Sequence, residues 1–163
     1  MSKFTPANDG VDHINIYSKG VTSLGRFLTN MNNVPVDTPH GRFKSVEGYW
    51  HFLKIKTLKS DFPEIIFNDA SCYEAKKIYK DFANRIKEMN DLTSQVVQTD
   101  EFRSAIMEVV KSKILSNPKM LESFRKNRLP YAHYYYYGKV DNPKIHYQDN
   151  YTWITSYLDK LEL

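Results

Sequence analysis

The sequence has almost no cysteine and no long apolar run. Cys72 is the single cysteine among 163 residues, so no internal disulfide can form, and one thiol cannot by itself make a thiolate cage for zinc. No stretch approaches the roughly 20 apolar residues of a transmembrane helix, and the N-terminal MSKFTPANDG lacks the basic and then apolar pattern of a secretory signal. We therefore expect a cytoplasmic protein with no membrane association and without a metal or cofactor.

Charge of one sign is not concentrated either. The 23 lysines and arginines are scattered among 19 acidic residues, for a formal charge of +4, which permits an anionic partner without requiring one. Aromatic residues are plentiful, with 12 Tyr, 9 Phe and 2 Trp. Because tyrosine offers a stacking face and a hydroxyl donor, these residues suit a planar, polar ligand, although many tyrosines simply occupy the edge of a core.

Length and composition favour one domain. A chain of 163 residues with 41% apolar residues can bury a sizeable core, and no repeat or low-complexity tract divides it. The polar residues 1–10 are expected to be frayed and flexible. We predict a mainly α fold, in which residues 1–163 form a single compact multihelical domain with a small amount of β structure near both ends.

Capping residues and apolar periodicity place the helices. Ser45 can cap a helix that runs to about Leu58, and Ser71 with Glu74 forms a capping box before apolar positions that recur as far as Met89. The remaining predicted elements follow from the same signals: a strand within 11–18, a loop over 20–41 with one helical turn around 24–28, a helix capped by Asp100, a short helix from Pro118, an extended segment over 131–138 and a last helix over 153–161.

The stretch RFKSVEGYWHFLK, residues 42–54, has polar groups at helical spacing. His51 and Lys54 follow Glu47 by four and seven residues, so the three side chains share one stripe, with Trp50 at its border. Glu47 and Lys54 lie about 10.5 Å apart along the axis, which lets both reach one bound ligand. The plainer alternative is a solvated stripe on an amphipathic helix whose aromatic residues are in the core.

Four motifs, in order, resemble the NADAR family, whose members are also called YbiA-like proteins. The motifs are LGRFLTN, GRFKSVEGYWHFLK, EAKK and KILSNP. The family pattern falls on Thr29-Asn30-Met31, on Val46-Glu47 through Lys54, on Ala75-Lys76 and on Lys113 to Pro118. The segment from the glutamate to the lysine is the most specific part of this resemblance, which spans most of the chain.

The resemblance implies a mainly helical fold and an N-glycosidase activity. Relatives are associated with removal of ADP-ribose from guanine, including in DNA, or with hydrolysis of phosphoribosyl intermediates of riboflavin synthesis. Departure of the nitrogen leaves oxocarbenium character on the ribose, which a carboxylate such as Glu47 stabilises while it orients or deprotonates water. Lys54 either holds a phosphate or hydroxyl of the substrate, the role we favour, or attacks C1 as an amine and forms a Schiff base.

Further residues are candidates for binding this substrate. A guanidinium at Arg26 suits a pyrophosphate, and an amide at Asn30 suits a ribose hydroxyl. Trp50 and one of the tyrosines over 134–137 can stack on a base. The predicted set of substrate-binding residues is Arg26, Asn30, Trp50, His51, Lys76, His133 and Tyr135. His51 and His133 are also candidate acids or bases, although a histidine beside aromatic rings is more often a packing residue.

The C-terminal part departs from the family pattern. Many YbiA-like sequences close with D-x-x-W-G-x-G and N-x-L-G, whereas this chain has HYYYYGK and DNYTWITSYLDKLEL. It therefore resembles a divergent branch, and a non-catalytic module that binds ADP-ribose or nucleic acid remains an alternative. The basic balance and the stacking residues favour a modified nucleic acid over a small intermediate. The sequence leaves open DNA, RNA or free nucleotide, the oligomeric state, and a setting in repair, toxin immunity or viral counter-defence.

Overall fold

The computed structural model describes residues 3–139 and 141–163 of a mainly helical chain, which confirms the predicted fold class. The chain divides into two compact units, one made of Met1–Thr29 with Ile114–Leu163 and one of Asn30–Lys113. We call them the terminal unit and the central unit and describe each by itself, so the single domain stays a prediction. Within the described ranges, no helix combines the length and the apolar character needed to cross a membrane.

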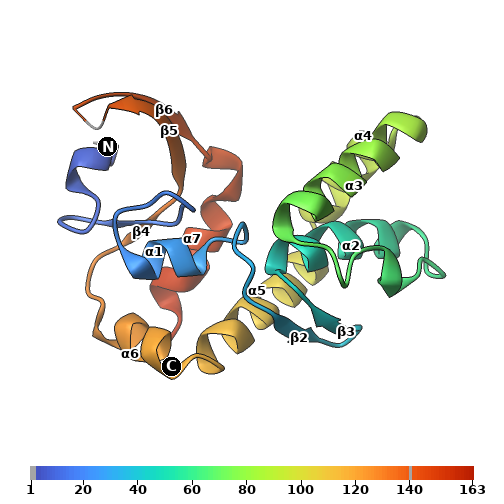
Figure 1. Ribbon diagram of the computed structural model, residues 1–163, viewed down its shortest axis with the longest axis horizontal. Helices are drawn as coiled ribbons and strands as arrows, with labels where there is room; N and C mark the ends of the chain where they lie inside the picture. Colours follow the sequence, from blue (N-terminus) through green and yellow to red (C-terminus); the bar gives the residue numbers. More distant parts are fainter. Residues whose placement is uncertain (1–2, 140) are drawn as a thin grey trace. The chain divides into compact units, whose positions relative to one another are not determined.

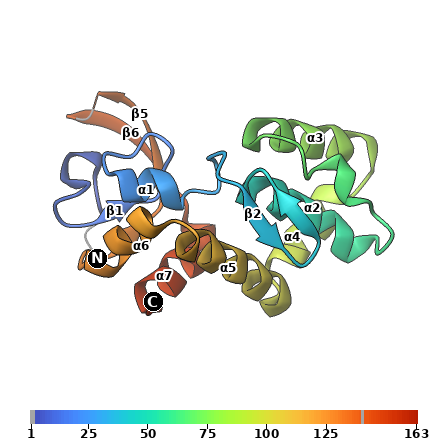
Figure 2. The same ribbon diagram turned by 60° about the horizontal axis from the view of Figure 1, so that its bottom comes forward.

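The central unit is a group of helices beside a small hairpin (Figures 1 and 2). Helix α2 packs against α3, α4 and strand β3. The elements in order are β2 (Val36–Thr38), β3 (Gly41–Phe43), α2 (Val46–Leu58), a 3-10 turn η2 (Glu64–Ile66), α3 (Cys72–Arg85), α4 (Met89–Val97) and α5 (Asp100–Leu115), the last running to the boundary of the unit. The sequence did not predict the β2–β3 hairpin, whose first strand lies in the segment interpreted as a loop over 20–41.

Helix α2 begins and ends where the sequence predicted. The Ser45 hydroxyl accepts a hydrogen bond from the Gly48 N–H at 3.0 Å and caps the first turn. Nearly every residue from Val46 to Ile55 is buried, including the polar His51 and Lys54. A helix that is buried on all sides lies at the centre of its unit, so its polar side chains are enclosed by the neighbouring helices rather than solvated.

Helix α3 has the predicted capping box but ends earlier than predicted. The Ser71 hydroxyl accepts the Glu74 N–H, and the Glu74 carboxylate accepts the Ser71 N–H at 2.7 Å. The prediction of one helix to Met89 was wrong, because α3 ends at Arg85, where Ile86 takes an extended conformation, and α4 starts at Met89 after Glu88 with a left-handed φ of 69°. The helix α5 is capped by Thr99, whose hydroxyl accepts the Phe102 N–H, one residue before the predicted cap.

The terminal unit joins the two ends of the chain (Figure 1). Strand β1 pairs in parallel with β4, and β5 forms an antiparallel hairpin with β6. Its elements are η1 (Pro6–Asn8), β1 (Ile14–Asn15), α1 (Ser23–Leu28), α6 (Pro118–Lys126), β4 (Tyr131–Ala132), β5 (Tyr134–Lys139), β6 (Asn142–Tyr147), η3 (Asp149–Tyr151) and α7 (Thr152–Lys160). These confirm the predicted helical turn at 24–28, the helix from Pro118 and the last helix, but β6 was missed.

A buried polar cluster fixes the start of β5. The Asn15 side chain donates to the Tyr134 carbonyl and accepts the Tyr134 N–H, both at 3.1 Å. The Asp9 carboxylate accepts the backbone N–H groups of Asn15 and Val21. Residues 1 and 2 lie outside the described part, but the rest of the segment expected to fray contains η1 and the buried Asp9, so it forms part of the unit.

Candidate active site

The structure brings Glu47 and His51 together on α2. The Nε2 of His51 lies 2.9 Å from Oε1 of Glu47, and the two side chains are 8% and 12% exposed. Lys54, one turn further along, is 7% exposed. A carboxylate, an imidazole and an ammonium are therefore enclosed along one helix, an arrangement that costs desolvation free energy and is uncommon in a helix that only packs.

His51 holds the carboxylate of Glu47 in place. The imidazole stacks on the ring of Tyr79, with centroids 4.8 Å apart, and lies near the ring of Phe67, the residue that follows η2. Burial lowers the pKa of His51, and the hydrogen bond to Glu47 only partly opposes this effect, so the ring is neutral at pH 7 and donates Nε2–H to the carboxylate. Its Nδ1 is buried without a hydrogen-bond partner in the described residues.

Lys54 is a buried ammonium that faces an aromatic ring. Its Nζ lies 3.6 Å from the centroid of Tyr79, at cation–π distance. Burial lowers the pKa of Lys54 to about 8, with the charge of Glu47 acting in the opposite direction. Within the part of the chain that the structure describes, the ammonium has no hydrogen-bond acceptor. Lys54 therefore has the donor capacity for a bound ligand, and roughly a tenth of it is uncharged at pH 7.

Tyr79 was missed by the sequence interpretation. It contacts both His51 and Lys54, and its hydroxyl donates to the Asn90 side chain on α4 at 3.0 Å. The available signal was its position four residues after Ala75 and three before Phe82, which places it on the apolar face of α3. Tyr79 thereby links the polar groups of α2 to α3 and α4.

The loop over 30–33 is fastened to three helices of the central unit. The Asn30 carbonyl accepts the Glu47 N–H at 3.3 Å, and the Asn33 side chain accepts the N–H of Cys72, the first residue of α3, at 2.9 Å. The Asn32 side chain accepts from Nζ of Lys113 on α5 at 2.7 Å. The loop that carries the predicted Asn30 is thus held against the start of the helix that bears Glu47.

Lys113 is the most deeply buried lysine of this group. It is 1% exposed, and burial lowers its pKa to about 7. Cys72, also 1% exposed, is close enough for its charge to raise the pKa of Lys113. Lys113 begins the fourth of the sequence motifs, and its bond to Asn32 gives it a structural contact.

The two buried lysines should make stability depend on pH. In the folded protein Lys113 has a pKa of about 7 and Lys54 a pKa of about 8, whereas in the unfolded chain both have a pKa near 10.5. Between these values the unfolded chain therefore binds more protons than the folded one. The free energy of unfolding therefore rises with pH in this window, by up to about 1.4 kcal/mol per pH unit for each lysine. Well below pH 7 both lysines are charged in the folded and the unfolded state, and they no longer contribute to the slope.

Urea unfolding at intervals from pH 7 to pH 9 measures this slope. Burial raises the pKa of Cys72 above its usual 9.0, so above pH 9 the folded chain keeps a thiol proton that the unfolded chain loses. This lowers the slope of the unfolding free energy against pH, and the measurement therefore ends at pH 9. We expect Lys113→Met to reduce the slope, whereas the same change at the exposed Lys80 leaves it unaltered. Equal slopes in the wild type and Lys113→Met would show that Lys113 keeps its ordinary pKa.

Two more predicted residues lie in the central unit. Lys76, exposed on α3, is near enough for its charge to contribute to the lowered pKa of His51, which places it at the rim of the site. Trp50 is 7% exposed and packs edge-on against Phe102 of α5, with centroids 5.0 Å apart. This packing accounts for Trp50 as a core residue, and its stacking on a base stays a prediction.

The other three predicted residues belong to the terminal unit. Nη1 of Arg26 donates to the carbonyls of Gly20 and Val21, both at 2.7 Å. His133 donates from Nδ1 to the Ile16 carbonyl at 2.7 Å, so this nitrogen carries a proton. Tyr135 packs at a tilt against Tyr17. The roles of Arg26, His133 and Tyr135 in substrate binding stay predictions.

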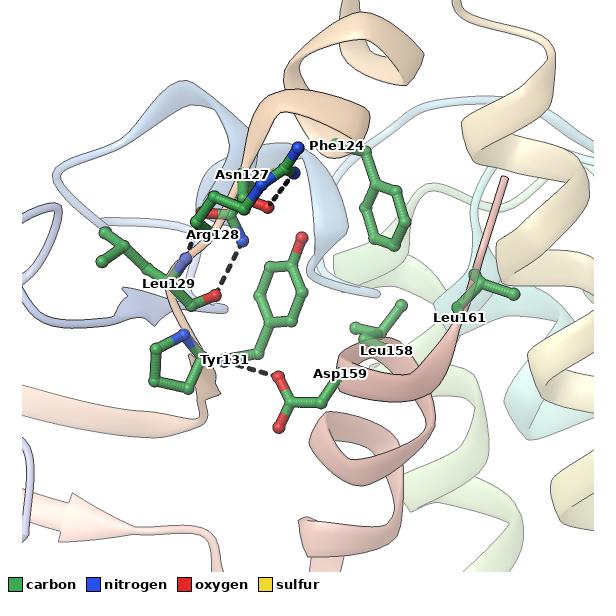
Figure 3. Close-up of a pocket in the computed structure, with 9 residues that line it drawn as sticks. Phe124, Asn127, Arg128, Leu129, Tyr131, Leu158, Asp159 and Leu161 are labelled. Atoms are coloured by element: carbon green, nitrogen blue, oxygen red, sulfur yellow. Dashed lines mark hydrogen bonds between the residues drawn. The ribbon is translucent and has the colours of Figure 1, made fainter.

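A cavity of about 410 Å³ opens in the terminal unit (Figure 3). Phe124 and Tyr131 stack along its wall, and Asp159 accepts the Tyr131 N–H at 2.9 Å. The lining residues are Phe124, Asn127, Arg128, Leu129, Pro130, Tyr131, Leu158, Asp159 and Leu161. None of the predicted site residues lines this cavity. Glu47, His51 and Lys54 on α2 therefore remain the candidate active site.

Comparison of the chain with protein families, curated proteins and solved structures returned no match. Among the residues that the structure describes, no group of three or more histidine, cysteine, aspartate or glutamate side chains is arranged to hold a metal ion. A function is therefore assigned from the chemistry of Glu47, His51 and Lys54 and from the sequence motifs that contain them.

Proposed function

We propose that the protein is an N-glycosidase that cleaves the bond between C1 of a ribose and a guanine nitrogen, and so removes ADP-ribose from modified DNA or nucleotides. The observation that carries the proposal is the pair of Glu47, with 12% of its side chain exposed, and the buried His51, with the ammonium of Lys54 one turn away. The four motifs that resemble the NADAR family, among them the segment from Glu47 to Lys54, also support the proposal.

Glu47 is the catalytic carboxylate in this proposal. Departure of guanine leaves positive charge on C1 and the ring oxygen of the ribose, and a nearby carboxylate stabilises that charge. His51 donates to Oε1 of Glu47, and Oε2 has no hydrogen-bond donor among the described residues. That oxygen can accept a proton from the attacking water while His51 keeps the carboxylate in a single orientation.

Lys54 positions the substrate through its charge. The ammonium lies over Tyr79 and lacks an acceptor among the described residues, so a phosphate or ribose hydroxyl would supply one. Lys76 adds a second positive charge at the rim, which suits the pyrophosphate of ADP-ribose. The uncharged fraction of Lys54 also allows the alternative in which the amine attacks C1.

Release of ADP-ribose from defined substrates tests the proposal. The purified chain is incubated in parallel with DNA and RNA oligonucleotides carrying ADP-ribosylated guanine, with the free modified nucleotide and with a phosphoribosylated pyrimidine. Chromatography with mass detection should find free ADP-ribose and restored guanine from at least one of the first three. Reaction of the pyrimidine alone would replace the proposal with the small-molecule activity. Tight calorimetric binding of ADP-ribose without release from any substrate would identify a non-catalytic binder.

A further inference from the structure

The β5–β6 hairpin of the terminal unit has one buried and one exposed face. Tyr134 is fully buried, and Tyr136, Ile145 and Tyr147 on the same face are half-buried. The register pairs Tyr135 with His146, Tyr137 with Lys144 and Lys139 with Asn142. We call these six residues the hairpin face. Five of them are exposed and Tyr135 is half-buried, so the alternation of the tyrosines along β5 continues through β6, a strand that the sequence did not reveal.

Aromatic rings and positive charges are combined on the hairpin face. Tyr137 is 60% exposed and contacts the ring of His146 edge-on, with centroids 5.5 Å apart. Lys139 and Lys144 form no ion pair with any residue in the described ranges. The six positions include no acidic residue, and the nearest acid in sequence, Asp141, lies in the turn beyond them.

We propose that the hairpin face binds single-stranded nucleic acid, with bases stacked on Tyr137 and His146 and phosphates held by Lys139 and Lys144. Proteins that bind single strands combine exposed aromatic rings with a positive track for the backbone. The partner therefore has unpaired bases and a negative backbone.

This binding goes beyond the proposed glycosidase, because an unmodified strand has the same bases and phosphates. A large apolar protein surface is a poorer match, since lysines are depleted in the core of protein interfaces. A duplex is also a poorer match, because its bases are stacked on each other and are not free to stack on Tyr137.

Fluorescence anisotropy with the full chain tests the proposal. The probe is a labelled oligothymidylate longer than the site sizes of about 4–16 nucleotides known for single-strand binders, with an oligouridylate and a duplex of equal length beside it. We expect a Kd between about 10⁻⁴ and 10⁻⁶ M at physiological salt for the single strands. The duplex should bind more weakly.

Two variants assign the binding to the hairpin face. Tyr137→Ala should weaken it about tenfold, the loss expected for one stacked base, and Lys144→Gln should lower the slope of log K against log salt by about 0.7. Matched controls in the central unit are Tyr73→Ala, whose tyrosine is 66% exposed, and the exposed Lys80→Gln.

Three results would each overturn the proposal. They are the absence of saturable binding, equal effects of the hairpin and control variants, and equal affinity for the duplex and the single strand. Circular dichroism of each variant separates a loss of binding from a loss of fold. Because Tyr137 and Lys144 are exposed, both variants are expected to fold.

Discussion

Glu47→Gln should reduce the rate of ADP-ribose release about 10³-fold while leaving the fold and the substrate affinity nearly unchanged. The loss has this size because positioned carboxylates contribute about 10²- to 10⁴-fold to such proton transfers. Glutamine has the same shape and keeps an oxygen that can accept the Nε2–H of His51, but it cannot stabilise positive charge or take a proton from water. The loss should therefore appear in kcat rather than in KM.

Single-turnover kinetics on the best substrate of the release assay measure this effect. The matched control is Glu108→Gln, an exposed glutamate on α5 of the same unit, which should release ADP-ribose at the wild-type rate. Thermal unfolding of both variants shows whether they are folded. If Glu47→Gln kept the wild-type rate, the carboxylate would not be the catalyst and the glycosidase proposal would lose its central residue.

Lys54→Met should weaken catalysis and strengthen the fold. Without its ammonium the site loses the positive charge that holds the substrate, and we expect kcat/KM to fall about 100-fold. At the same time, a buried charge without an acceptor is replaced by an apolar side chain of similar length, which should raise the free energy of unfolding by about 1–2 kcal/mol. Lys80→Met, an exposed lysine on α3, should change neither quantity.

The two roles considered for Lys54 have different signatures. If the lysine only positions the substrate, Lys54→Arg keeps a positive charge and should recover part of kcat/KM, and reduction with cyanoborohydride during turnover should leave the protein mass unchanged. If the amine attacks C1, the C1–N bond to guanine breaks as the bond to Nζ forms, and opening of the ribose ring gives an imine that the hydride reduces. A mass increase by ADP-ribose located at Lys54 would then refute the positioning role.

The sequence predicted α2 correctly because the required information is local. The Ser45 cap, the acid in the first turn and the spacing of apolar residues all lie within the helix itself. The common stripe of Glu47, His51 and Lys54 follows directly from helical geometry. The depth of burial did not follow, because it depends on α3, α4 and the loop over 30–33, which come from other parts of the chain.

Features formed by distant residues were missed for the same reason. Asn32 bonds to Lys113 across 81 positions, and no local pattern distinguishes Asn32 from an ordinary turn residue. The end of α3 at Arg85 could not be predicted either, since the chain leaves the helix at Ile86 and turns at Glu88, and neither residue is a glycine or proline that would have signalled the break. Strand β6 contains Pro143, which normally argues against a strand and is tolerated here in a two-stranded hairpin.

The burial of Cys72 gives the central unit an intrinsic reporter of local opening. It is the sole thiol of the chain, begins α3 and is almost completely shielded, so an alkylating reagent can reach it only when the start of that helix separates from its neighbours. The alkylation rate therefore measures how often the region beside Glu47 opens, with no competing signal from a second cysteine.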